Sequence, residues 1–204
     1  MRSPDALLCD MNGLFRHWRN AGARAGETAA GLPTGTLDVY AYQHPSYDEA
    51  KVGILTDQEW ADDVQGRLVN DFGPHAKAAI PPWRADRGEV DAVMVDLLGQ
   101  ARQHLPVAVL SNCTNALHSD LAHHGIEFDF VFPSADIGAV KPTPQAYLTA
   151  ASRMGVAPER LYFFDDQEAF VAGAVGAGLD GELFIGAAAF AKTLDRLGIK
   201  VAFP

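Results

Sequence analysis

The chain has 204 residues, of which 48% are hydrophobic and 21% are charged. This is the composition of a globular protein that buries a sizeable core, and the length suits one domain with at most a smaller insertion. The formal net charge is −10, with the acidic residues scattered along the sequence, which argues against nucleic acid and anionic membrane surfaces as partners. If the ligand is itself an anion, the site must concentrate positive charge locally, through a metal ion or a lysine.

No stretch approaches the roughly 18 uninterrupted apolar residues that a membrane-spanning helix needs. Near the N-terminus, Asp10 and Asn12 interrupt the apolar run too early for a signal peptide, so we expect a cytoplasmic protein. The two cysteines, Cys9 and Cys113, do not form a short metal-ligand spacing, and we interpret them as buried thiols.

The first predicted element is a short buried strand over residues 6–9, which delivers Asp10 into a turn that contains Gly13. The block that follows, residues 15–105, shows several helix starts and no convincing strand. A helical insertion at this point of a doubly wound sheet predicts a cap over the carboxyl edge of the sheet, where ligands bind in such folds.

Two helices stand out within this block. Thr56 and Glu59 form a capping box that opens an amphipathic helix, and that helix is expected to end near Gly73. A second amphipathic helix is predicted over residues 89–104. The aromatic residues of the block are interpreted as packing residues and not as the lining of a ligand pocket; they include Trp18, Tyr42, Tyr47 and Trp83.

The remainder of the chain alternates short apolar runs with amphipathic stretches, which indicates strand–helix units and a parallel sheet. The predicted strands cover residues 107–110, 129–132, 161–164 and 182–185, and the predicted helices 115–124, 144–155 and 168–178. We therefore expect an α/β fold of three layers, with a doubly wound parallel core formed by residues 1–14 and 106–204 and a helical cap formed by residues 15–105.

Polar side chains follow four of the predicted strands, and in an open parallel sheet these strand ends meet at one crevice. Taken singly, each has an ordinary explanation as a turn cap, a helix cap or a solvated loop lysine. Their joint occurrence, in order, favours a site for a divalent cation and a tetrahedral anion, and carboxylate oxygens suit Mg²⁺. The residues are Asp10, Ser111, Asn112, Lys141, Asp165 and Asp166.

These residues lie in motifs that resemble those of the haloacid dehalogenase superfamily, a group dominated by magnesium-dependent phosphatases with a Rossmann-like core. The motifs are Asp10-Met11-Asn12-Gly13, Leu110-Ser111-Asn112, Gly138-Ala139-Val140-Lys141-Pro142 and Phe163-Phe164-Asp165-Asp166. The resemblance covers nearly the whole chain, because the helical block is placed like the cap of many members. Residues 44–60 resemble the small helical cap of the branch that contains sugar-phosphate phosphatases and the phosphatase domain of epoxide hydrolases. A response-regulator receiver domain is disfavoured, because its acidic pair precedes its phosphoacceptor Asp.

The resemblance implies a role for each motif. Asp10 would attack a phosphoryl group and form an aspartyl-phosphate that water hydrolyses. Mg²⁺ would be held by the Asp10 carboxylate, the backbone carbonyl of Asn12 and Asp166, with Asp165 nearby or bonded through water. The transferring oxygens would be bound by Ser111, the backbone of Asn112 and the charge of Lys141.

Asn12 departs from the family pattern, because most phosphatases of this family carry a second Asp there as general acid and base. An amide cannot transfer a proton in this way, and general acid–base catalysis contributes ~10² to 10⁴ in rate. Three interpretations remain open. The protein is a phosphatase of small phosphomonoesters with a good leaving group, or with a proton from the substrate or from a cap residue such as His17 or His44. Alternatively it is a dehalogenase-type C–X hydrolase, or a weakly active or non-catalytic phosphoryl-binding or regulatory protein.

Overall fold

The computed structural model describes residues 3–203, and a five-stranded parallel sheet forms its centre. The strand order is β5-β4-β1-β6-β7, with β1 between β4 and β6. The strands are β1 (Ala6–Cys9), β4 (Val107–Ser111), β5 (Phe130–Pro133), β6 (Leu161–Asp165) and β7 (Asp180–Leu183). The prediction of an α/β fold with a parallel sheet is confirmed. The last strand lies two residues earlier than predicted.

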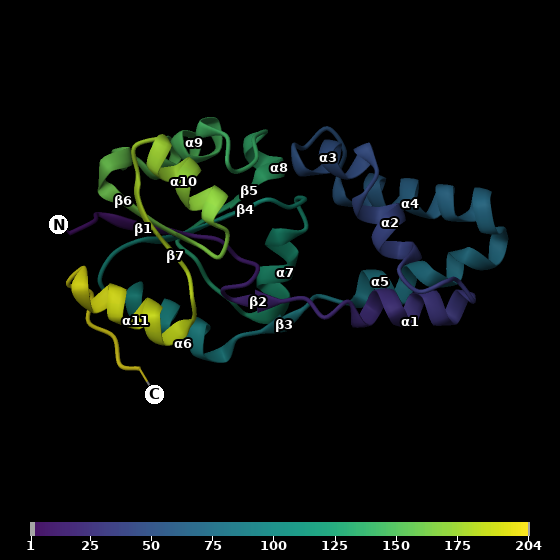
Figure 1. The fold of residues 1–204 in the computed structure, drawn as a ribbon, viewed down its shortest axis with the longest axis horizontal. Helices are drawn as coiled ribbons and strands as arrows, with labels where there is room; N and C mark the ends of the chain where they lie inside the picture. Colours follow the sequence, from purple (N-terminus) through teal and green to yellow (C-terminus); the bar gives the residue numbers. More distant parts are fainter. Residues whose placement is uncertain (1–2, 204) are drawn as a thin grey trace.

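Helices cover both faces of the sheet (Figure 1), and alternate residues of β1 belong to two different hydrophobic clusters. Leu7 and Cys9 pack with α6 (Ala92–Ala101), α7 (Leu117–His124) and α11 (Ala187–Arg196). On the other face, Leu8 packs with α9 (Pro144–Met154) and α10 (Glu168–Gly176). Because β1 is completely buried between the two layers, the core fixes the position of Asp10, the residue that follows this strand.

The helices between β1 and β4 form a separate hydrophobic cluster, whose buried residues run from Ala23 to Trp83. We call residues 21–85 the helical unit; Figure 1 shows it extending away from the sheet, beyond α7 and α8. Its elements are α1 (Ala21–Ala30), α2 (Thr36–Tyr42), α3 (Pro45–Lys51), α4 (Asp57–Phe72), the 3₁₀ helix η1 (Pro74–Ala79) and α5 (Ile80–Ala85). An antiparallel ribbon of β2 (Arg16–His17) and β3 (Glu89–Val90) joins the unit to the sheet.

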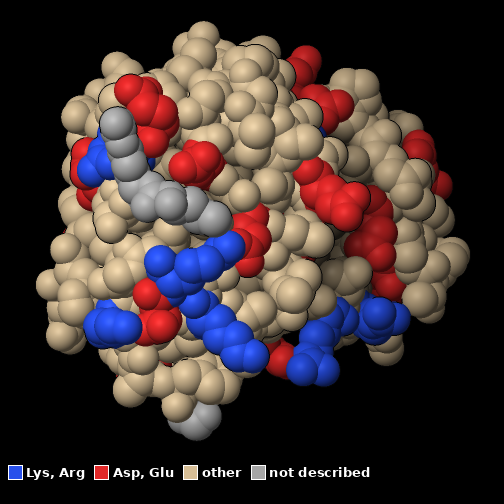
Figure 2. Space-filling model, turned by 60° about the vertical axis from the view of Figure 1, so that its left-hand side comes forward, with Lys and Arg blue, Asp and Glu red and all other residues tan. Residues whose placement is uncertain are grey.

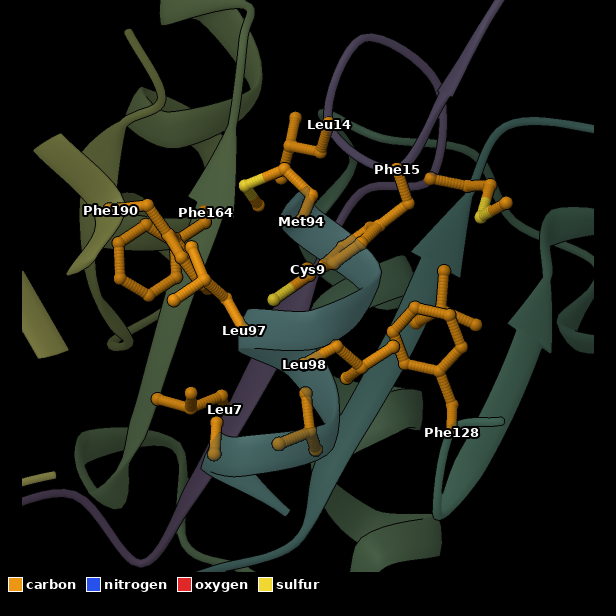
Figure 3. Close-up of a cluster of buried hydrophobic side chains, with 14 of the residues drawn as sticks. Leu7, Cys9, Leu14, Phe15, Met94, Leu97, Leu98, Phe128, Phe164 and Phe190 are labelled. Atoms are coloured by element: carbon orange, nitrogen blue, oxygen red, sulfur yellow. The ribbon is translucent and has the colours of Figure 1, made fainter. Parts of the chain in front are cut away.

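The ribbon corrects the expectation that residues 15–105 contain no strand. Two-residue strands carry too little alternation to be recognised from sequence. The helix predicted over residues 89–104 is also shorter, because Asp91 caps its start by accepting the Met94 N–H at 3.0 Å. This helix, α6, packs on the sheet through Leu97 and Leu98 (Figure 3). The structure thus groups α6 with the core, whereas the predicted boundaries grouped it with the helical block.

The capping box is confirmed: Thr56 Oγ1 accepts the Glu59 N–H at 3.2 Å, and the Glu59 carboxylate accepts the Thr56 N–H at 2.8 Å. The helix α4 ends before Gly73, whose φ of 92° terminates it. The helix α11 is not among the elements predicted from sequence. Its buried residues Phe190 and Leu194, together with Leu197 directly after it, nevertheless recur at helical spacing. Short turns complete the chain at α8 (Ser134–Ile137) and η2 (Pro158–Arg160).

The surface carries charges of both signs. On the face shown in Figure 2, acidic and basic side chains lie in small groups among uncharged residues, and several basic groups lie against acidic ones. Within residues 3–203, no helix combines the length and apolar character needed to cross a bilayer.

Candidate active site

Asp10 begins a tight turn at the carboxyl end of β1. Its backbone N–H donates to the Phe164 carbonyl at 2.9 Å, so the sheet pairing continues into the turn. The Met11 carbonyl accepts the N–H groups of Phe15 and Arg16 at 2.9 and 3.1 Å, which closes the turn. Asp10 is only 5% exposed. The turn therefore presents a buried carboxylate at the edge of the sheet.

Gly13 brings the backbone of this turn against Asp166. A Cβ atom at residue 13 would lie 2.0 Å from Asp166 Oδ2, and the φ of Gly13 is +82°. Both facts require glycine here. The missing side chain thus allows the Asp166 carboxylate, from the loop after β6, to lie over the turn that carries Asp10.

Lys141 provides the positive charge of the cluster. Its Nζ lies 3.0 Å from Asp10 Oδ1 and 2.5 Å from Asp165 Oδ2, and its side chain is completely buried. The rings of Phe163 and Phe170 lie 5.4 and 5.1 Å from the same nitrogen. Burial acts to lower the pKa of Lys141, but the attraction of Asp10 and Asp165 is greater, and the pKa is raised above its ordinary value. Lys141 therefore remains a fixed cation.

Three carboxylates crowd together beside this lysine. One oxygen from each of Asp10, Asp165 and Asp166 can be chosen so that all lie within 4.8 Å of one another. Burial raises the pKa of Asp165 to about 6, and the Asp10 carboxylate adds to this against the attraction of Lys141. Burial, followed by the charge of Asp10, also raises the pKa of Asp166. A divalent cation among these oxygens would remove the cost of their mutual repulsion.

The donor set fits magnesium. Among the described residues, Asp10 Oδ1 is buried without a hydrogen bond of good geometry, so it can serve as a ligand. The two oxygens of Asp165 are already engaged, because Oδ2 contacts Lys141 and Oδ1 accepts the Gln167 N–H at 2.9 Å. Asp166 is exposed and lies over Gly13. Asp10 and Asp166 are therefore better placed than Asp165 for direct contact with an ion.

The second predicted motif lies at the end of β4. Ser111 is 1% exposed and borders a cavity of about 180 Å³ together with Asp10, Lys141 and Asp166. The side chain of Asn112 makes two hydrogen bonds to the backbone of Lys141: Nδ2 donates to its carbonyl, and Oδ1 accepts its N–H, both at 2.8 Å. The amide side chain of Asn112 thus holds the lysine loop in place, which the sequence motif alone did not indicate.

A larger cavity of about 450 Å³ lies between the helical unit and the sheet. Asn12 and Asn112 border both this cavity and the smaller one, so the two spaces adjoin at these residues. The interpretation of the aromatic residues as packing alone is wrong, because all four border the larger cavity, and Trp18 and Tyr42 are 44% and 45% exposed. The four residues are Trp18, Tyr42, Tyr47 and Trp83, and Trp60 joins them. Neither His17 nor His44 borders either cavity.

The side chain of Asn12 is fixed by two donors. Arg16 Nε and Trp18 Nε1 donate to Asn12 Oδ1 at 3.1 and 3.0 Å. Arg16 is in turn held by Asp120, which accepts from Arg16 Nη1 at 2.6 Å and from Arg87 Nη1 at 2.9 Å. No sequence motif indicated these partners, because Asp120 is more than one hundred residues from Arg16 along the chain.

The helical unit contacts the core directly beside the larger cavity. Thr114 Oγ1 donates to Asp57 Oδ1 at 2.7 Å, and the Asp57 N–H donates to Asn115 Oδ1 at 2.9 Å. Arg84 pairs with the other oxygen of Asp57. The backbone at Gly53 lies so close to the core that a Cβ atom there would meet the Ala135 carbonyl oxygen at 2.3 Å. The start of α4 is thus anchored to the loop that follows β4.

A parallel sheet with a polar cluster at its carboxyl edge defines a doubly wound α/β protein, and proteins of this class bind their ligands at that edge. The model of the haloacid dehalogenase-like hydrolases matches residues 82–178. The chain is 31% identical over 117 residues to the fructose-1-phosphate phosphatase YqaB of Escherichia coli (strain K12). That match covers 54% of this chain and 62% of the relative, which is less than two thirds of the relative's length.

Two solved structures share the fold. One is the HAD family enzyme BT-2542 from Bacteroides thetaiotaomicron in complex with magnesium and inorganic phosphate, with 18% identity and a TM-score of 0.71 over 88% of this chain and 93% of that one. The other is the defluorinating L-2-haloacid dehalogenase Rha0230, with 22% identity and a TM-score of 0.70 over 91% and 85% of the two chains. Over residues 82–178, and in its fold, the chain is similar to the haloacid dehalogenase-like hydrolases.

Proposed function

We propose that this chain is a magnesium-dependent phosphatase that hydrolyses small phosphomonoesters through an aspartyl-phosphate on Asp10. The observation that carries the proposal is the contact of Lys141 with Asp10 and Asp165, beside Asp166, at a cavity of about 180 Å³. This arrangement suits a phosphoryl group and a cation. The similarity to a fructose-1-phosphate phosphatase supports it, as does the cavity of about 450 Å³ that the helical unit borders beside the site.

The residues divide the work as follows. An Asp10 oxygen forms a bond to phosphorus while the bond from phosphorus to the leaving oxygen breaks, and water then attacks the same phosphorus and restores the Asp10 carboxylate. Ser111, the backbone of Asn112 and Lys141 bind the phosphoryl oxygens. Asp10, the backbone carbonyl of Asn12 and Asp166, with Asp165 behind them, would hold Mg²⁺. When bound, the ion offsets the repulsion between the nucleophile and an anionic substrate.

Two other functions compete with this one. A C–X hydrolase shares the fold, as the dehalogenase neighbours do, and its halide leaves without a proton, so Asn12 would be no handicap. The cluster of Asp10, Asp165 and Asp166 disfavours it, because three carboxylates at one site suit a metal ion. A non-catalytic phosphoryl-binding protein would keep the same cluster and bind without turnover.

One assay separates the three. We expect phosphate release from small phosphomonoesters in Mg²⁺, loss of release with chelator, and loss with Asp10→Asn. Halide release from 2-haloacids in the presence of chelator would instead establish the C–X hydrolase. Binding of Mg²⁺ and a phosphate analogue without release of either product would establish the binding protein. Asp136→Asn serves as a control, because Asp136 lies away from both cavities and pairs with His118 at the surface.

A further inference from the structure

Asn12 stands where the two cavities adjoin, and only one of its side-chain groups is available there. Its Oδ1 is occupied by Arg16 Nε and Trp18 Nε1, both of which can only donate, so the orientation of the amide is unambiguous. Within residues 3–203, Nδ2 makes no hydrogen bond and is not among the buried polar atoms without a partner. The amide therefore offers N–H donors to whatever lies across the junction.

A phosphate ester bound across the junction would place its bridging oxygen at Asn12. The phosphoryl group belongs in the smaller cavity with Asp10 and Lys141, and the rest of the ester belongs in the larger one. The bridging oxygen joins the two parts. An N–H donor at this oxygen can stabilise negative charge that develops on it, but cannot transfer a proton to it.

The larger cavity offers few groups that could supply the missing proton. Asp120 is bound to two arginines, and Asp57 is bound to Arg84 and Thr114. The two oxygens of Asp86 accept the backbone N–H groups of Gly22 and Gly88. The oxygens of these carboxylates are therefore already engaged as hydrogen-bond acceptors within the protein. Asp38 is the remaining carboxylate of the lining, and no hydrogen bond to its side chain occurs among residues 3–203.

The same pairing makes the larger cavity unsuited to a second anionic group. Each arginine of the lining is already bound to an aspartate, and the lining contains three arginines and four aspartates. A second phosphate or a carboxylate would find no arginine in the lining whose charge is not already offset by an aspartate. The walls are otherwise aromatic, with Trp18 and Tyr42 the most exposed rings. A neutral ring packs well against such walls.

We propose that the site is specialised for phosphate esters of an acidic hydroxyl, such as a phenol or an anomeric hydroxyl, carried on a neutral ring. This inference rests on the proposed phosphatase function. As the bond between phosphorus and the bridging oxygen breaks, its electron pair stays on that oxygen, which leaves as an anion bound to Asn12 Nδ2. The oxygen then takes its proton from water. Its basicity, and not a protein acid, sets the rate of the first step.

The test is the dependence of kcat/KM on the pKa of the leaving hydroxyl, measured with neutral aryl and alkyl phosphates in Mg²⁺. Because kcat/KM reports the step in which the ester bond breaks, we expect alkyl phosphates to fall ~10² to 10⁴-fold below activated aryl phosphates, the range that a general acid would otherwise recover. For an aryl phosphate with a carboxylate on the ring, kcat/KM should be at least tenfold lower than for a neutral aryl phosphate whose leaving hydroxyl has the same pKa.

Variants and controls make the test decisive. Asn12→Asp should reduce the ratio of kcat/KM for aryl esters to kcat/KM for alkyl esters, and Asp38→Asn should leave this ratio unchanged. If kcat/KM does not depend on the leaving group, or if the ratio of kcat/KM for aryl esters to that for alkyl esters increases in Asp38→Asn, the inference is overturned and the phosphatase function stays intact. Failure of every ester to release phosphate, including the most activated, would overturn the proposed function and the inference with it. Unaltered thermal unfolding of each variant verifies that the fold is retained.

Discussion

Trp18 donates its indole N–H to Asn12 Oδ1 at 3.0 Å, and Arg16 stacks on the Trp18 ring with its guanidinium carbon 4.6 Å from the ring centroid. A wall of the larger cavity is thereby joined to the turn that carries Asp10. The orientation of Asn12 depends on two residues that belong to no catalytic motif.

Replacing Trp18 by Phe keeps an aromatic wall and removes the N–H donor. Since a neutral hydrogen bond contributes about 0.5–1.5 kcal/mol, we expect kcat/KM to fall by up to about tenfold for all substrates. Trp18 is 44% exposed, so the midpoint of thermal unfolding should change little. Wild-type kcat/KM in this variant would show that the hydrogen bond does not position Asn12.

Asn12→Asp supplies the carboxylate that the family resemblance implies at this position. We expect its steady-state turnover to rise above wild type, most for poor leaving groups, because acid–base help becomes available in both steps. The gain is limited by Arg16 and Trp18, whose donors favour the ionised form of a carboxylate at this position. In the wild type, rapid-mixing experiments should show a burst of leaving-group release followed by slow turnover, because Asn12 cannot activate water for hydrolysis of the aspartyl-phosphate. An unchanged or lower rate in a folded Asn12→Asp variant would mean that proton transfer occurs elsewhere.

Gly13→Ala should displace Asp166, because the new Cβ would lie 2.0 Å from Asp166 Oδ2. We expect the Mg²⁺ concentration needed for half-maximal activity to rise at least tenfold. Gly31→Ala is the matched control: Gly31 also has a positive φ, of +61°, but a Cβ there would meet nothing within 4 Å. Both variants share the backbone strain, of about 1 kcal/mol. Equal Mg²⁺ requirements in the two variants would argue against contact between Asp166 and the ion.

Asp57 should make the anchoring of α4 dependent on pH. Burial acts to raise its pKa, but Arg84 and Thr114 outweigh this, and the pKa of Asp57 is lowered below its ordinary value of 3.8. Its contribution to stability is therefore complete above the unfolded-state pKa and is lost as the pH falls through the lower folded-state pKa. At neutral pH we expect Asp57→Asn to lower the free energy of unfolding by about 1.5–3 kcal/mol. The difference from wild type should shrink below about pH 4 in denaturant titrations; a difference that persists there would contradict this account.

The sequence indicated the parallel sheet and the convergence of its polar strand ends, because both depend on local patterns. Asp10 and Asp165 each come at the end of a buried run, and the direction of these runs in a parallel sheet fixes where the two residues meet; Lys141 lies in the loop beyond the neighbouring strand β5. The partners of Asn12 could not be predicted in this way. Arg16 reaches Asn12 through a tight turn and is held by Asp120 from a distant helix, and no periodicity encodes either contact. The grouping of α6 with the core likewise depends on tertiary packing, since an amphipathic stripe does not specify what it packs against.

The formation of an aspartyl-phosphate on Asp10 is the central claim, and it can be tested by acid-quenching the enzyme during turnover of an aryl phosphate in Mg²⁺. Mass spectrometry of the peptide that contains Asp10 should then show one added phosphate, absent when chelator is present and absent in Asp10→Asn. Because Asn12 lacks a carboxylate to activate water for the second step, the modified fraction should be large. Steady release of phosphate with no modification of that peptide would contradict the account.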